Sequence, residues 1–331
     1  MEKIPIPVSL LELALITQGS NVRDTLQKTS DIAQKADELD YKRLWFAEHH
    51  NMPHIASAAT VVLISYYAQK TKKIRIGSGG IMLPNHSPLV VAEQFGTLDA
   101  LFPRRIDLGL GRAPGTDPVT AQALNKNFFQ AAQQFPQHVA ELQQYFSPEN
   151  SSFPVRSFSS ESASVPFWIL GSSTESAKLA ARYGLPYAFA SHFAPNQLLE
   201  ALAIYRHHFQ PSAHLSKPYA MVCANVIISD TEQEAQKQAT AMYQMFLDML
   251  HDNRRPIQAP LESMEGIWSA REEAYIRNML SRTFIGTAKQ VQKDLIEFQK
   301  LVHADELMIT LPIYSHSLRL KVLELARTLF I

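Results

Sequence analysis

The chain has 331 residues, of which 46% are hydrophobic, and its 31 lysines and arginines balance 31 aspartates and glutamates. With this balance and no basic block, nothing in the composition indicates binding to nucleic acid or to an anionic membrane surface, and we expect neither. The single cysteine, Cys223, excludes an intrachain disulfide and a multi-cysteine zinc site. No run approaches the roughly 20 apolar residues of a membrane-spanning helix. We expect a soluble cytoplasmic protein.

Short apolar runs alternate with helical patterns along the chain. The runs that predict strands are 9–16, 43–48, 74–83, 105–111, 166–172, 186–193, 219–229 and 306–313. The first run lacks the basic flank and cleavage site of a signal peptide, so we interpret it as a strand. Between the runs, apolar residues recur at helical spacing, as in 24–40 and 196–209. Thr287 is predicted to cap one helix, and Asp230 or Thr231 another.

This alternation predicts a parallel sheet, because parallel neighbours need a crossover connection. Eight strand–helix pairs in a chain of this length favour a closed (β/α)8 TIM barrel over an open doubly wound sheet. Since no linker divides the chain, we expect one domain over residues 1–331. Two connections, 112–165 and 244–286, exceed the usual loop length. The second interrupts the seventh crossover, and either could form a lid.

The chemistry of such a barrel lies at the carboxyl ends of its strands, where Glu48, His49 and His50 follow the second predicted strand. Successive strand residues point to opposite faces, so both histidines cannot project into the barrel. The chain has no His-x-His or His-Glu-x-x-His spacing, and we expect no metal site. An acid–base site and a polar strand end, with one histidine bonded to backbone, remain as interpretations.

The stretch "ILGSSTESAKLAARYG" (169–184) predicts a strand, a small polar turn and a helix. Backbone N–H groups at the helix start, with the hydroxyls of Ser172, Ser173 and Ser176, make an anion site suited to a phosphate. Arg112, after the fourth predicted strand, could supply a charged partner. The alternatives are an ordinary serine-capped helix and a surface arginine.

Three glycines, Gly77, Gly79 and Gly80, lie within the third predicted strand. Glycine weakens a strand, so this cluster indicates a bulge, an unusual backbone or the close approach of a flat ligand. A plain turn is the alternative.

In order, "AEHHN", "GSGGIMLPNHSPLVVAEQFGTLDALFPRRIDLGLGRAPGTDP" and "LGSSTESAKLAARYGLPYAFASHF" resemble the bacterial luciferase-like flavin-dependent monooxygenase family, in its non-luminous alkanal monooxygenase-like branch. The resemblance extends from "VSLLELALI" to "MITLPIYSHSLRLKVLELA". It implies a (β/α)8 barrel that forms a homodimer and binds FMN, which a separate NAD(P)H:flavin reductase supplies in reduced form. It also implies a reaction with O2 that oxidises a small organic substrate, such as an aldehyde.

The resemblance also assigns residues. His49 matches the catalytic histidine, with Glu48 beside it, and Gly79–Gly80 matches a non-prolyl cis peptide against the flavin. The family's phosphate contacts match Arg112, Ser172, Ser173 and Ser176, and its mobile lid matches 244–286. Where luciferases carry a reactive cysteine this chain has Gly111, so light emission is not expected.

Two alternatives remain open. One is a deazaflavin-dependent oxidoreductase, which would have the same fold and use the same phosphate site. The other is a flavin-binding protein without turnover. The sequence does not identify the substrate.

Overall fold

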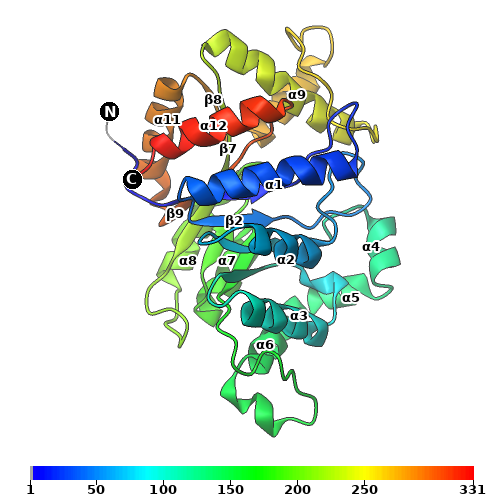
Figure 1. The fold of residues 1–331 in the computed structure, drawn as a ribbon, viewed down its shortest axis with the longest axis vertical. Helices are drawn as coiled ribbons and strands as arrows, with labels where there is room; N and C mark the ends of the chain where they lie inside the picture. Colours follow the sequence, from blue (N-terminus) through cyan, green and yellow to red (C-terminus); the bar gives the residue numbers. More distant parts are fainter. Residues whose placement is uncertain (1–2) are drawn as a thin grey trace.

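The computed structural model describes residues 3–331 as a barrel of parallel strands surrounded by helices (Figure 1). The strands are β1 (Val8–Glu12), β2 (Arg43–Phe46), β3 (Arg75–Met82), β4 (Ile106–Gly111), β5 (Phe167–Gly171), β6 (Tyr187–Phe189), β7 (Ala220–Ile228), β8 (Thr283–Gly286) and β9 (Glu306–Thr310). The helices are α1 (Val22–Glu38), α2 (Thr60–Lys70), α3 (Pro88–Leu101), α4 (Pro118–Leu124), α5 (Phe128–Gln133), α6 (Phe135–Tyr145), α7 (Thr174–Tyr183), α8 (Leu198–His207), α9 (Glu232–Leu250), α10 (Ala270–Met279), α11 (Ala288–Val302) and α12 (His316–Thr328), with short 3-10 helices at Leu83–Asn85 and Pro148–Ser152.

Strands β1 to β7 and β9 form a closed barrel. Each of β1 to β6 pairs in parallel with the next strand, and β9 pairs with both β1 and β7. The closure is visible at Val222, which is in register with Phe189 of β6 and with Leu307 of β9. The predicted (β/α)8 barrel is confirmed.

Strand β8 was not predicted, and it corrects the boundaries of the 244–286 segment. It pairs with the outer half of β7, Asn225 to Ile228, beyond the part that β6 covers. At the other end of the segment, α9 continues to Leu250. The irregular part of this crossover is therefore 251–269, followed by α10 and β8.

The predicted caps hold the helices next to these strands. Thr287 forms a capping box with Gln290 at the start of α11. Thr231, rather than Asp230, caps α9, while Asp230 pairs with Lys321 at 2.8 Å. The long connection 112–165 contains three α-helices, α4, α5 and α6. Among residues 3–331, no helix has both the length and the hydropathy to span a membrane.

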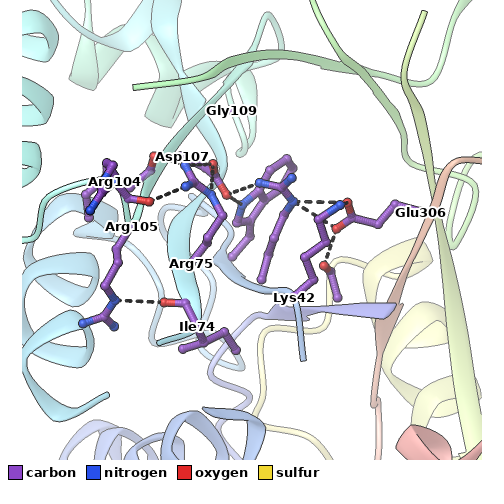
Figure 2. Close-up of polar contacts among 12 residues, drawn as sticks. Lys42, Ile74, Arg75, Arg104, Arg105, Asp107, Gly109 and Glu306 are labelled. Atoms are coloured by element: carbon purple, nitrogen blue, oxygen red, sulfur yellow. Dashed lines mark hydrogen bonds and ion pairs between the residues drawn. The ribbon is translucent and has the colours of Figure 1, made fainter. Parts of the chain in front are cut away.

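A charged network closes the amino end of the barrel (Figure 2). Arg43 donates to Asp107 at 2.7 Å and to Glu306 at 3.0 Å, and Arg75 reaches Asp107 at 2.6 Å. These four residues, which we call the charged plug, lie at or near the starts of their strands, and both carboxylates are fully buried. Above the plug the interior is apolar, and its side chains include Leu11, Trp45, Trp168, Met221, Cys223 and Met308.

Candidate active site

A cavity of about 850 Å³ opens at the carboxyl ends of the strands. Its wall brings together residues predicted from widely separated parts of the sequence, namely His49, Gly79, Arg112, Ser172, Ser173 and Ser176. Leu11 and Ala47, which belong to the apolar interior, form part of the wall as well. The other two predicted site residues, Glu48 and Gly80, lie behind the lining.

At one end of the cavity, α7 begins directly after the turn that follows β5. Ser173 caps the helix and accepts from the Ser176 backbone N–H at 3.5 Å. The end of β5 approaches this turn closely, since a Cβ at Gly171 would lie 2.2 Å from Ser176 Oγ. Tyr187, which sequence reasoning missed, donates its hydroxyl to the Ser173 carbonyl at 3.2 Å and lies 2.9 Å from Ser176 Oγ. These two contacts hold the turn in place.

The charges around this helix start favour an anion. Within residues 3–331, Arg112 makes no hydrogen bond or ion pair, and it is exposed at the cavity wall. Glu175, in the first turn of α7, is neutralised by Lys178 at 2.7 Å. The hydrogen bond from Lys178, aided by the charge of Arg112, lowers the pKa of Glu175. A free guanidinium therefore faces a helix start, where the helix dipole also favours negative charge.

His49 stands in the wall of the barrel mouth. Its Nδ1 is 3.1 Å from the carbonyl oxygen of Gly115. A carbonyl only accepts, so Nδ1 carries the proton and Nε2 is left as an acceptor. Burial lowers the pKa of His49, against the opposing effects of the Gly115 hydrogen bond and the Glu48 charge. The imidazole is therefore neutral at pH 7.

Glu48 makes no hydrogen bond to the ring of the adjacent His49. Its buried carboxylate accepts hydrogen bonds at 2.9–3.0 Å from four donors, which are Met82 N, Asn85 Nδ2, His50 Nε2 and His86 Nε2. Burial alone would raise the pKa of Glu48, but the bonds from His50 and His86 lower it to about 2. Glu48 is thus a charged anchor behind the cavity wall.

The Gly79–Gly80 peptide bond is cis, as the resemblance implied. Gly79 lines the cavity, and a Cβ there would lie 2.7 Å from Leu11 Cδ1. A Cβ at Gly80 would lie 2.8 Å from the carbonyl oxygen of Gly109 in β4. Gly77 serves packing instead, since a Cβ there would lie 2.4 Å from the Asp107 carbonyl oxygen.

A second histidine lines the cavity near His49. His192 follows β6, and burial together with the nearby His49 lowers its pKa to about 3. Two neutral imidazoles therefore border the barrel mouth at pH 7. In residues 3–331, no group of three or more His, Cys, Asp or Glu side chains is arranged to hold a metal ion.

The segment 251–269 reaches from α9 to loops at the barrel mouth. Ile257 forms backbone hydrogen bonds with Ile16 and Gln18, at 2.9 and 2.8 Å, in the loop after β1. Further along the mouth, Arg254 lies 3.8 Å from Asp117, which follows β4. The segment therefore contacts the loops after β1 and β4, and its role as a lid stays a prediction.

Comparison with known proteins identifies the class. A family model described as luciferase-like monooxygenase matches residues 10–304, so the chain belongs to the luciferase-like monooxygenase family and is a monooxygenase of that family. It is 47% identical to the uncharacterized protein YvbT of Bacillus subtilis, over 96% of this chain and 95% of that protein. It is 46% identical to a luciferase-like monooxygenase of Escherichia coli, over 97% and 96% of the two chains.

A named relative is the N-acetyl-S-alkylcysteine monooxygenase of Bacillus subtilis, 33% identical over 93% of each chain. Among solved structures, apo-MsnO8 is similar with a TM-score of 0.91 and 30% identity, over 98% of this chain and 99% of that one. The fold alone is shared with an FMN complex of a type II Baeyer-Villiger monooxygenase (TM-score 0.72, 16% identity) and with an F420-dependent secondary alcohol dehydrogenase (TM-score 0.67, 13% identity).

Proposed function

We propose that the protein is an FMN-dependent monooxygenase, which uses reduced FMN and O2 to oxidise a small organic molecule. The observation that carries this proposal is a single cavity whose wall contains both a helix start beside an unpaired arginine and a neutral imidazole, His49. The cavity volume of about 850 Å³ lies within the usual range of ligand pockets, roughly 300–1,000 Å³.

The residues present fit FMN. Arg112, Ser172, Ser173 and Ser176 would hold its phosphate, because they combine an unpaired guanidinium with hydroxyls at a helix start. The apolar mouth beside the Gly79–Gly80 peptide would receive its ring system. When bound, reduced FMN supplies the electrons with which the family activates oxygen.

The chain's own groups then have separate tasks. His49, with Nε2 free to accept, takes up and returns a proton during oxygen chemistry at neutral pH. Segment 251–269 excludes water from the mouth, which a reactive site of this kind requires. The aliphatic wall favours a neutral, largely apolar substrate. The named relative makes thioethers worth testing beside aldehydes.

We also propose that a separate NAD(P)H:flavin reductase in the cytoplasm delivers the reduced FMN, since the sequence has no nicotinamide-binding motif. A homodimer is supported by apolar side chains exposed on neighbouring helices, Val62 and Tyr66 on α2 and Val90 and Leu101 on α3. Such a patch is typical of a surface that a partner covers.

One observation favours a second candidate, a deazaflavin-dependent oxidoreductase. The cavity wall continues along α7 to Arg182, which makes no ion pair or hydrogen bond within residues 3–331. Arg182 lies about 12 Å along the helix from Thr174, at 1.5 Å per residue. A cofactor with an anionic extension beyond its phosphate would provide a partner for this arginine.

The test measures oxygen consumption by the purified protein with chemically reduced FMN, across aldehydes and thioethers. We expect one oxygen atom from isotopically labelled O2 to be incorporated into the oxidised product. Tight FMN binding, with O2 consumption no faster than that of free reduced FMN, would favour a flavin-binding protein without turnover. Turnover with a reduced or oxidised deazaflavin in the absence of O2 would favour the second candidate.

A further inference from the structure

We infer that Glu48 is a positioning residue for His49 and acts through Asn85 and the loop after β4. The catalytic role of His49 rests on the proposed function. The hydrogen bonds that position His49 do not depend on it. The Glu48 charge acts directly on the pKa of His49, but Glu48 makes no hydrogen bond to the ring, so its effect on the ring's position passes through other groups.

The connection consists of hydrogen bonds between neighbouring loops. Asn85 donates one amide hydrogen to Glu48 Oε1 and another to the carbonyl oxygen of Pro114, both at 3.0 Å. Pro114 precedes Gly115, whose carbonyl oxygen accepts from His50 N at 3.2 Å and lies 3.1 Å from His49 Nδ1. Asn85 thus links the Glu48 carboxylate to the peptide that immediately precedes the one whose carbonyl binds His49.

The anchor of this connection is well fixed. Glu48 is 1% exposed, and four donors surround its carboxylate. Two of them, His50 and His86, come from different loops, so the carboxylate joins the loop after β2 to the loop after β3. A buried carboxylate with satisfied hydrogen bonds holds its neighbours in one arrangement.

The functional consequence concerns the tautomer of His49. With Gly115 O in place, Nδ1 carries the proton and Nε2 accepts. If the loop of Pro114 and Gly115 shifts, the ring loses this preference, and a fraction of the molecules presents a protonated Nε2 that cannot act as a base. Asn85 and Glu48 therefore determine the fraction of molecules in which His49 Nε2 can accept a proton.

The chain offers a matched control for Asn85. Asn125 donates its amide to the carbonyl oxygen of Pro84 at 2.8 Å, and so anchors the same loop after β3 from the other side. Unlike Asn85, Asn125 makes no bond to Glu48 or to Pro114. Asn85→Ala and Asn125→Ala each remove one anchor of this loop, but only the first interrupts the connection to His49.

The experiment records the ring nitrogen NMR signals of His49 in full-length protein labelled with ¹⁵N-histidine, assigned by comparison with His49→Gln. We expect wild type and Asn125→Ala to show the Nδ1–H form, and Asn85→Ala to show a mixture of tautomers. The kcat should fall about ten- to a hundredfold in Asn85→Ala, which is the usual effect of removing the hydrogen-bond partner that orients a metal-binding histidine. FMN affinity should be unchanged. Asn85→Ser, too short to bridge, provides a second variant if Asn85→Ala does not fold.

An unchanged His49 signal in the Asn85 variants, or an equal change in Asn125→Ala, would overturn the inference. The NMR measurement needs neither flavin nor turnover, so it stands even if the protein consumes no oxygen with reduced FMN. Conversely, altered tautomers without a change in kcat would show that the positioning exists but that His49 is not the base, which contradicts the functional part.

Discussion

Gly115 packs directly onto the backbone of Glu48, so that a Cβ at Gly115 would lie 2.4 Å from the Glu48 carbonyl oxygen. Gly115 also has a φ of +67°, in the left-handed region. The loop after β4 can therefore reach the end of β2, and His49 can meet the Gly115 carbonyl, only while this position lacks a side chain.

Gly115→Ala should lower the free energy of unfolding and slow substrate oxidation, because the loop must move away from Glu48 and His49. Gly266→Ala is the control, since Gly266 has a φ of +73° but nothing within 4 Å of its added Cβ. It isolates the backbone cost of roughly 1–2 kcal/mol. Urea unfolding and steady-state kinetics check both variants. Equal losses in the two would mean that the contact with Glu48 is unimportant.

His49→Ala should retain FMN affinity but reduce oxidation by about 10²–10⁴, the usual contribution of a general base or acid. Burial lowers the pKa of His49, so in wild type the rate should rise with pH below about 6.5 and be constant through neutral pH. His50→Ala should mainly lower stability, because His50 bonds to Glu48. Loss of turnover in folded His50→Ala, with His49→Ala active, would reverse these roles.

Arg112→Ala should weaken FMN binding at least tenfold while leaving riboflavin binding nearly unchanged, because a charge-assisted hydrogen bond is worth about 1.5–3 kcal/mol. Arg182→Ala, which changes another arginine of the cavity wall, should leave FMN binding unaffected. Fluorescence titrations with both flavins provide the measurement. A similar loss for riboflavin and FMN in Arg112→Ala would argue against the phosphate assignment.

Asp107→Asn should lower the free energy of unfolding by about 3–5 kcal/mol, since it removes the buried counter-charge of Arg75 and leaves Arg43 with Glu306 alone. Burial tends to raise the pKa of Asp107, but the charges of these arginines hold it below its ordinary value. The folded pKa lies below the unfolded one, so this stabilisation is present above about pH 4 and lost on further acidification.

The acid dependence provides a second measurement of the same variant. Stability of wild type should fall between pH 5 and pH 2, and more gently in Asp107→Asn. Asp40→Asn removes the exposed ion pair with Lys73 and should change little at any pH. Chemical denaturation at several pH values tests this, and parallel curves for wild type and Asp107→Asn would contradict it.

Trypsin should cut the free protein first at Arg254 or Arg255, which are half exposed in segment 251–269. FMN and substrate should slow the cut if the segment closes over the mouth. Asp248→Asn removes the 2.7 Å contact with Arg255 and should accelerate cleavage. Mass spectrometry of the fragments identifies the site. Initial cleavage elsewhere, with this segment resistant, would count against a lid.

The barrel was predictable because its strands lie in short apolar runs that alternate regularly with helical patterns. The missed strand, β8, is only Thr283–Gly286 and is mostly half-buried, so its sequence lacks a strong apolar pattern. The first strand ends earlier than predicted, at Glu12, because Ala14 takes a φ of +53° and donates its N–H to the Glu12 carboxylate. A local reversal of this kind has no apolar signature.

The parts of the site that depend on residues close together in the sequence were predictable. The serine turn and the helix that Ser173 caps are examples. The contacts of Glu48 were not, since Asn85 and His86 lie far along the chain and reach it only through the adjacency of β2 and β3. The supporting hydroxyl of Tyr187 is another such case. It comes from the following strand and reads in sequence as an ordinary core aromatic.

The charged plug determines the route by which ligands can enter and leave the barrel. Because Arg43, Arg75, Asp107 and Glu306 seal one end of the barrel, a molecule that reaches the floor at Leu11 must leave by the route it entered. If the proposed cofactor and substrate bind in this cavity, they and the product share one opening. Whichever lies deepest must arrive first and depart last, so the catalytic cycle should follow a fixed order of entry and exit.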